Sequence, residues 1–235
     1  TEVTGKNLGI IGCGNIGTIV AKRALGLEFK VSVYDPFLQE EKARELGVKK
    51  ISLDELFSQS DFITLHTPLN EKTKNIINKE SFLKMKKGVR IINCARGGLV
   101  DEIALKENLD NGKVASAALD VFVNEPPTDS KLLGTKNLIL TPHLGASTTE
   151  AQEKVAIQIA EQICNFLKTG AISNAVNTFS LSAKEYNLVK PYLRLSNLLG
   201  SFAGQLTENA IKKIEVEFEG QASKVNTQPL IQTLI

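Results

Sequence analysis

Short apolar segments rich in isoleucine and valine alternate with segments of helical periodicity up to about residue 141. Each apolar segment is nearly continuous in hydrophobicity, which is typical of parallel strands that are covered on both faces of a sheet. Strands that alternate with helices form stacked βαβ units. We therefore predict a doubly wound α/β fold with strands at residues 7–12, 30–35, 48–51, 61–66, 89–94, 115–120 and 137–141.

The segments between these strands carry signals for the starts and ends of helices. After the first strand, apolar residues recur at helical spacing, at Ile16, Ile19, Val20, Ala24 and Leu27. Ser52 and Glu55 have the spacing of a capping box, which opens a helix. Gly47, Gly88 and Gly112 stand where helices should end.

A longer helix is predicted after the last strand. It opens at Ser147 with Glu150 three residues on, and it ends before Gly170. Its apolar stripe consists of Ala151, Val155, Ile159, Ile163 and Phe166. Cys164 lies inside this helix and is interpreted as an inert core residue.

The remainder of the chain is interpreted as the start of a second α+β domain. Residues 171–182 are expected to form a loop, followed by a helix that is broken or begins afresh at Pro191. The alternation of Ile214, Val216 and Phe218 predicts a strand. We place the first domain at residues 1–170 and the partial second domain at residues 171–235.

The turn after the first strand carries a glycine fingerprint. Gly12, Gly14 and Gly17 follow a predicted strand and open a predicted helix, which is the context of a dinucleotide-binding site. Gly12 permits the tight turn, Gly14 lets backbone amides approach a pyrophosphate, and Gly17 allows close packing of helix on sheet. Asp35 ends the second strand, where a carboxylate accepts hydrogen bonds from ribose hydroxyls and repels a 2′-phosphate. The sequence therefore predicts a Rossmann-type domain that binds NAD rather than NADP.

Other interpretations of this turn stay open. The glycines could serve only to pack a helix on a strand, without a ligand. Cys13 could be a redox-sensitive thiol at the helix N-terminus, although a small filler residue is the simpler interpretation.

Three chemically distinct side chains follow strands in the second half of the predicted sheet. Arg96 comes after the fifth strand, Glu125 after the sixth and His143 after the last. Ligand sites of parallel sheets open at the carboxyl ends of the strands. Hydride transfer from a hydroxy acid needs a proton acceptor, a carboxylate to hold it, and a guanidinium to bind the substrate carboxylate. These residues therefore form a candidate catalytic group.

The motifs around these residues resemble those of the D-isomer-specific 2-hydroxyacid dehydrogenases. The resemblance extends from about residue 4 to residue 169. Besides the glycine fingerprint, it rests on His66-Thr67-Pro68-Leu69, Asn93-Cys94-Ala95-Arg96-Gly97-Gly98 and His143-Leu144-Gly145-Ala146-Ser147-Thr148. Residues 190–201 and 215–220 are similar to an additional domain found in long bacterial members.

The resemblance implies a role for each candidate residue. His143 takes the hydroxyl proton as hydride leaves for the nicotinamide, Glu125 supports His143, and Arg96 binds the substrate carboxylate. The implied cofactor is NAD, held by Gly12, Gly14, Asn15, Ile16, Gly17, Asp35, His66, Thr67, Cys94, Ala95, Arg96, Asp120, His143, Gly145 and Ala146. The implied substrate is a phosphorylated 2-hydroxy acid, and the implied assembly is a homodimer or homotetramer.

Alternatives to this function stay open at the level of sequence. The substrate could be another 2-hydroxy acid or its keto acid, such as hydroxypyruvate, glyoxylate or lactate. The protein could instead be an NAD(H)-sensing scaffold, because fold does not settle function. A sensor has no physical need for Arg96, Glu125 and His143 together. His66 could contact the cofactor or only cap the fourth strand.

The resemblance also implies that segments of the family are absent from this sequence. In the family, part of the substrate domain precedes the glycine fingerprint, and long members continue into a regulatory domain. We therefore interpret the sequence as a fragment. We expect it to bind NAD but to turn over weakly or not at all, because a wall that excludes water from the cleft is missing.

The composition indicates which kinds of partner and which cellular compartment to expect. Lys and Arg number 28 against 26 Asp and Glu, and the basic residues are scattered, so neither nucleic acid nor a membrane surface is an expected partner. No apolar run is long enough for a membrane span. Cys13, Cys94 and Cys164 have no paired spacing, and the polar start does not resemble a signal peptide, which favours the cytoplasm. The two histidines lie far apart and predict no metal site.

Overall fold

The computed structural model describes residues 2–175, 181, 183–206 and 211–235. By its internal contacts the chain divides into two compact units, Thr1–Thr148 and Thr149–Ile235, and each is described by itself. The sequence pattern predicts a domain boundary at residue 170. The contacts assign the long helix that ends at Thr169 to the second unit instead.

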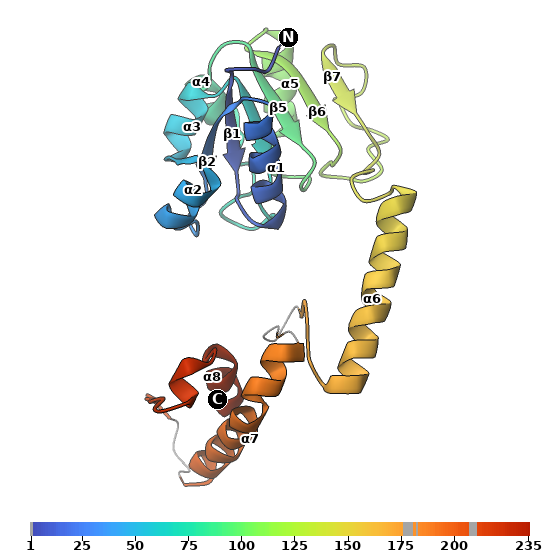
Figure 1. The fold of residues 1–235 in the computed structure, drawn as a ribbon. Helices are drawn as coiled ribbons and strands as arrows, with labels where there is room; N and C mark the ends of the chain where they lie inside the picture. Colours follow the sequence, from blue (N-terminus) through green and yellow to red (C-terminus); the bar gives the residue numbers. More distant parts are fainter. Residues whose placement is uncertain (1, 176–180, 182, 207–210) are drawn as a thin grey trace. The chain divides into compact units, whose positions relative to one another are not determined.

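The first unit contains a seven-stranded parallel sheet in the order β3-β2-β1-β4-β5-β6-β7 (Figure 1). Its strands are β1 (Asn7–Ile11), β2 (Lys30–Tyr34), β3 (Lys49–Lys50), β4 (Phe62–Leu65), β5 (Val89–Asn93), β6 (Val114–Leu119) and β7 (Leu138–Leu140). Each predicted strand is present. Because the order reverses between β1 and β4, the predicted doubly wound fold is confirmed, and ligand sites are expected at that edge.

Helices connect the strands and cover the sheet in two sets. They are α1 (Asn15–Gly26), α2 (Glu40–Leu46), α3 (Leu53–Gln59), α4 (Lys79–Lys84) and α5 (Glu102–Asp110). Ala21 of α1 and Ala43 of α2 belong to one buried cluster, whereas Leu56, Phe82 and Leu105 of the other three helices belong to a second. Successive residues of a strand point to opposite faces, so these clusters lie on the two faces of the sheet.

The helix signals predicted at Ser52, Gly47 and Gly112 are present in the structure, whereas Gly88 does not end a helix. Ser52 and Glu55 form the capping box of α3, with the Glu55 N–H donating to Ser52 Oγ at 3.3 Å. Gly47 ends α2 in the left-handed conformation, at φ 73°. Gly112 follows the C-cap of α5 and also has positive φ, at 75°. The prediction for Gly88 is wrong, because α4 already ends at Lys84 and Gly88 lies in the turn before β5, with φ 84°.

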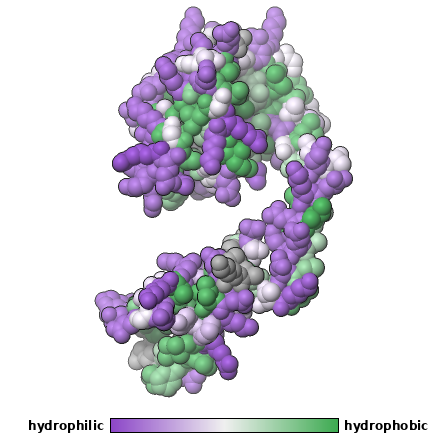
Figure 2. All heavy atoms as spheres, in the orientation of Figure 1, coloured by the Kyte–Doolittle hydropathy of each residue, from purple (hydrophilic) through white to green (hydrophobic). Residues whose placement is uncertain are grey.

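One face of the sheet is left uncovered over β5–β7 in the described part of the chain. A shallow groove of about 320 Å³ runs there beside Phe62, Arg90 and Ala118, and Ile139 is 66% exposed. Figure 2 shows apolar residues at the surface in this region. The prediction that the strands are covered on both faces is therefore wrong for this part of the sheet.

The second unit is helical where the structure describes regular elements. It contains α6 (Thr149–Thr169), α7 (Ala183–Gln205), a short 3₁₀ helix (Ala222–Lys224) and α8 (Gln228–Leu234). Leu181, Val189 and Leu230 form its small buried cluster. Among the described residues, no helix combines the length and the apolar character needed to cross a membrane.

Three sequence predictions in this unit are wrong. Pro191 does not break α7, which runs through it, because Tyr192 next to it packs on the buried cluster and keeps the helix in place. Residues 211–219 form no strand, since no neighbouring strand pairs with them, and Phe218 packs on the same cluster. Cys164 is exposed rather than buried, because α6 has no buried residue.

Candidate active site

The glycine loop between β1 and α1 has the geometry that the fingerprint predicts. Gly12 has φ 93°, and a Cβ there would lie 2.6 Å from the His66 carbonyl oxygen. A Cβ on Gly17 would lie 2.1 Å from the Gly12 carbonyl oxygen. Around Gly14, the residue before α1, no atom beyond the chain neighbours comes within 4 Å of an added Cβ. Packing therefore requires Gly12 and Gly17, whereas Gly14 leaves space for a phosphate at the helix N-terminus.

Asp35 follows β2 and turns its carboxylate toward this loop. Oδ2 accepts a hydrogen bond from the Cys13 N–H at 2.7 Å, and Oδ1 accepts one from the Phe37 N–H at 2.8 Å. Each oxygen keeps acceptor capacity for a hydroxyl group. The residues therefore fit the ribose and pyrophosphate of NAD, and the charge of Asp35 disfavours a 2′-phosphate.

A cavity of about 290 Å³ opens at the carboxyl ends of the central strands. It is lined by Ile16, His66, Thr67, Pro68, Cys94, Ala95 and Arg96. All of these except Pro68 were predicted as cofactor contacts from the sequence. The structure thus brings the start of α1 and the loops after β4 and β5 together around one space.

Arg96 is the charged group of this cavity. Burial lowers the pKa of His66, whose Nε2 lies 3.0 Å from Thr64 Oγ1, so the neutral imidazole is favoured. Partial burial, and after it the charge of Asp120, raise the pKa of Cys94, so its thiol form is favoured. A cavity with one cationic residue and neutral neighbours suits an anionic ligand.

Glu125 and His143 meet in the loops after β6 and β7. His143 Nδ1 lies 2.7 Å from Glu125 Oε2, and the Phe122 N–H donates to Glu125 Oε1 at 3.0 Å. The hydrogen bond from His143, and after it the one from Phe122, lower the pKa of Glu125. The carboxylate therefore fixes the imidazole through Nδ1 and leaves Nε2 to exchange a proton with a substrate.

Asp120, at the end of β6, holds the backbone that carries His143. Oδ1 accepts hydrogen bonds from the Thr141 hydroxyl at 2.5 Å and the Leu144 N–H at 2.7 Å, and Oδ2 accepts one from the Gly145 N–H at 2.8 Å. Burial alone would raise the pKa of Asp120, but these hydrogen bonds outweigh it and lower the pKa. His143 has φ 56°, a conformation that costs a non-glycine residue about 1–2 kcal/mol. The bonds to Asp120 stabilise that conformation.

The Arg96 loop is ordered by Asn93 and packs against the Glu125 loop. The Asn93 side chain donates to the Arg96 carbonyl at 2.9 Å and accepts from the Ala95 N–H at 3.1 Å. A Cβ on Gly97 would lie 1.7 Å from the Phe122 carbonyl oxygen. The Arg96 guanidinium is exposed and donates to the Ala95 carbonyl at 2.6 Å rather than to the Glu125–His143 pair.

The predicted site residues thus fall into two groups at one edge of the sheet. The first lines the cavity beside the glycine loop, and the second is the Glu125–His143 pair with Asp120 and Gly145. Asn15 begins α1 and Ala146 lies in the exposed loop after His143, and neither lines a cavity of the site.

Sequence reasoning missed Pro68 and Thr141. In the structure Leu119 pairs with Leu140, which places Asp120 and Thr141 side by side at the ends of adjacent strands. That register is a property of the fold, so the sequence carried no direct signal for the bond. Across the described residues, no group of His, Cys, Asp or Glu could hold a metal ion.

Two family models match the chain. Residues 1–145 match the NAD-binding domain of the D-isomer-specific 2-hydroxyacid dehydrogenases, and residues 188–235 match the D-3-phosphoglycerate dehydrogenase intervening domain. Among curated proteins, D-3-phosphoglycerate dehydrogenase of Bacillus subtilis (strain 168) is 44% identical over 235 residues, which is 100% of this chain and 45% of the relative. The chain therefore spans less than half the length of this relative.

Solved structures of related enzymes match the fold. A glyoxylate reductase from Paecilomyes thermophila is 38% identical with a TM-score of 0.68, over 75% of this chain and 54% of its own. D-lactate dehydrogenase from Aquifex aeolicus, in a complex with NAD and lactic acid, is 36% identical with a TM-score of 0.62, over 69% of this chain and 54% of its own.

Proposed function

The chain belongs to the D-isomer-specific 2-hydroxyacid dehydrogenases, with the family's NAD-binding domain at residues 1–145, and from this we propose its reaction. We propose that the protein oxidises 3-phospho-D-glycerate to 3-phosphooxypyruvate, the first step of L-serine biosynthesis. The observation at the site that best supports this proposal is the 2.7 Å contact between His143 Nδ1 and Glu125 Oε2.

Each residue of the proposed mechanism has one task. When bound, NAD⁺ accepts the hydride from C2 of the substrate. His143 takes the C2 hydroxyl proton at Nε2, and Glu125 holds the ring through Nδ1 and stabilises the charge that the ring gains. Arg96 binds the substrate carboxylate and polarises the C2 oxygen. In the reverse direction His143 returns the proton to the keto oxygen.

The choice of substrate rests on the relatives. The matching intervening domain and the Bacillus subtilis relative both carry the name D-3-phosphoglycerate dehydrogenase. The glyoxylate reductase and D-lactate dehydrogenase structures favour an alternative, which is a smaller unphosphorylated acid.

A paired binding and turnover assay tests this function. NADH is titrated with this chain and its fluorescence is measured. NADH oxidation is then followed after addition of 3-phosphooxypyruvate or of hydroxypyruvate. The same assay is run on the full-length gene product, because the chain spans 45% of its relative. We expect this chain to bind NADH, and we expect the full-length gene product to consume the phosphorylated keto acid preferentially. Preference for hydroxypyruvate or glyoxylate would support the alternative substrate instead. NADH binding with no turnover by the full-length product would contradict the proposal that the protein is an enzyme.

We further propose that the protein is a cytoplasmic homodimer or homotetramer. The apolar face over β5–β7 and the exposed stripe of α6, with Ile159 and Ile163, support association, because large exposed apolar patches mark interfaces. Cys13, Cys94 and Cys164 are free thiols, which supports a reducing compartment. Light scattering coupled to gel filtration tests the assembly, and a monomer at all concentrations would contradict it.

A further inference from the structure

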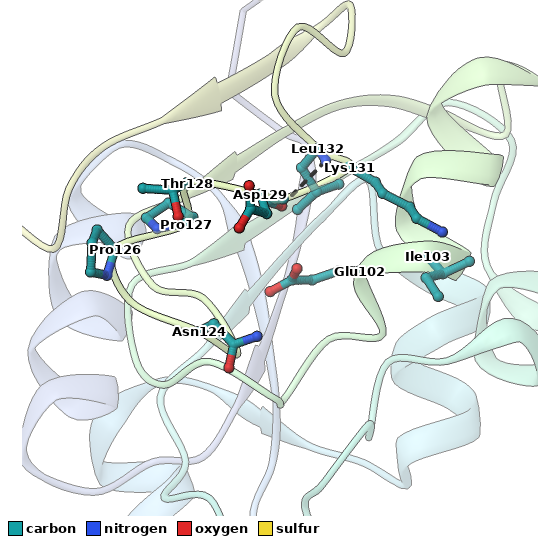
Figure 3. A pocket seen from close by; sticks show the side chains of 10 residues that line it. Glu102, Ile103, Asn124, Pro126, Pro127, Thr128, Asp129, Lys131 and Leu132 are labelled. Carbon is teal, nitrogen blue, oxygen red and sulfur yellow. Dashed lines mark hydrogen bonds between the residues drawn. The ribbon is translucent and has the colours of Figure 1, made fainter.

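Glu102, the first residue of α5, connects the chain segment after Arg96 to the loop that supplies Glu125. Its Oε1 accepts a hydrogen bond from the Val123 N–H at 2.9 Å, across 21 positions of sequence. Figure 3 shows the Glu102 side chain leaving α5 and pointing toward the loop that carries Asn124 and Pro126. This side chain is outside every motif that the sequence analysis used.

The peptide plane between Phe122 and Val123 is fixed on two sides. Its N–H donates to Glu102, and its carbonyl oxygen lies against Gly97, where an added Cβ would come within 1.7 Å. The preceding N–H, that of Phe122, donates to Glu125. Two neighbouring amides therefore bind two carboxylates, and one of these carboxylates is the partner of His143.

Glu102 is not needed to begin its own helix. Asp101 is the N-cap of α5, and its Oδ1 accepts hydrogen bonds from the Ile103 and Ala104 N–H groups, each at 3.0 Å. Glu102 lines an open cavity of about 250 Å³, where the other charged side chains are Asp129 and Lys131. The Glu102 carboxylate instead accepts the hydrogen bond from the Val123 N–H, which is a contact with the loop of the site.

We propose that Glu102 is a positioning residue for the dehydrogenase reaction: by binding the Val123 N–H it holds the turn at residues 121–125, so that the Glu125 carboxylate stays on His143. This inference rests on the proposed function, because it gives the Glu125–His143 pair a chemical task. Glu102 acts through the loop and touches neither substrate nor cofactor.

Variants at Glu102 separate the hydrogen bond from the charge. Glu102→Ala removes the acceptor, and Glu102→Gln keeps one. Glu102→Met keeps the length of the side chain without an acceptor, and it replaces the alanine variant if that variant does not fold. Glu107→Ala removes an exposed carboxylate from the same helix and is the matched control.

Nuclear magnetic resonance gives readouts that do not depend on turnover. In Glu102→Ala we expect the Val123 amide to exchange roughly tenfold faster or more, because the bond that protects it is lost. We also expect the pKa of Glu125, which its hydrogen bonds lower, to rise toward the ordinary range as the Phe122 donor loosens. Glu55 is the internal reference. Hydrogen bonds from Ser52 lower its pKa, and it lies in α3, away from this loop.

Kinetics then test the positioning role in the full-length gene product. We expect Glu102→Ala to lower kcat roughly tenfold with little change in the KM for NADH, and Glu102→Gln to restore it, because small displacements of an acid–base pair are costly. An unchanged Glu125 titration in Glu102→Ala and Glu102→Met, or an equal effect of Glu107→Ala, would overturn the proposal. If instead none of the keto acids tested supports NADH oxidation by the wild-type protein, the proposed function fails. The resonance result still decides whether Glu102 holds the loop.

Discussion

Three glycines of the turn between β1 and α1 illustrate the residue scale, because the same substitution should affect them differently. Gly14→Ala meets no neighbour in the structure and should change the free energy of unfolding by about 1 kcal/mol or less, the cost of a poorer N-cap. We expect it to weaken NADH binding roughly tenfold or more, since the methyl group occupies the space in front of the helix N-terminus.

Gly17→Ala is the matched comparison. Its Cβ would collide with the Gly12 backbone, so we expect a loss of stability of about 1–3 kcal/mol or more. Urea unfolding and NADH fluorescence titration measure the two effects separately. Wild-type NADH affinity in Gly14→Ala would show that the pyrophosphate does not approach this residue.

The charge of Glu125 predicts a pH dependence of stability. Hydrogen bonds from His143 and Phe122 lower its pKa in the folded state. Its contribution to stability is therefore present above its unfolded-state pKa and is lost as pH falls through the folded-state pKa. The difference in unfolding free energy between the wild type and Glu125→Gln should be largest near neutral pH and should shrink in acid. A difference that does not vary with pH would contradict this assignment, and Glu107→Gln provides the control.

Sequence could predict the residues of the site whose role follows from a strand end or a fixed spacing. Asp35 directly follows β2, and Arg96, Glu125 and His143 lie in the loops after β5, β6 and β7. The hydrophobic pattern locates these strands. Glu102 could not be predicted, because its bond to Val123 depends on the path of two irregular loops. No periodicity in the chain encodes that path.

At the scale of elements, contact between the loop after β5 and the loop after β6 joins the two halves of the site. Gly97→Ala should push these loops apart and destabilise the protein by about 1–3 kcal/mol, with a loss of turnover. Gly26→Ala, at the end of α1, meets no neighbour and should be neutral or stabilising by up to about 1 kcal/mol. Chemical unfolding measures the free energy of unfolding of both variants. Equal values for Gly97→Ala and Gly26→Ala would contradict the close packing at Gly97.

Elements were predictable where local signals agreed with packing. The strands and the capping box at Ser52 carried both signals. Residues 211–219 have an alternating pattern but no partner strand, and a strand cannot satisfy its backbone hydrogen bonds alone. Pro191 is a strong local breaker, yet packing of the neighbouring side chains keeps α7 continuous.

At the scale of the whole molecule, both large buried clusters lie within the first unit. We therefore expect residues 1–148 expressed alone to unfold cooperatively and to bind NADH as the longer chain does. Circular dichroism and NADH titration check this. Absence of a cooperative transition, or loss of NADH binding, would show that the second unit is needed for the first to fold.

The uncovered face over β5–β7 was not predicted, because the strands there resemble buried strands in their hydrophobicity. Arg90 and Ser116 were the available hint, since both are polar residues on that face. Which segments lie against a sheet is a property of the complete fold. A strand pattern by itself reports only that the strand is largely apolar.

We propose above all that His143, held by Glu125, exchanges the proton of a 2-hydroxy acid beside bound NAD. The most direct test compares His143→Asn with the wild type in the full-length gene product, measuring the NADH dissociation constant and the rate of NADH oxidation by 3-phosphooxypyruvate. We expect nearly unchanged NADH affinity and a fall in kcat by a factor of about 10²–10⁴. Turnover near the wild-type rate, or loss of NADH binding together with turnover, would contradict it.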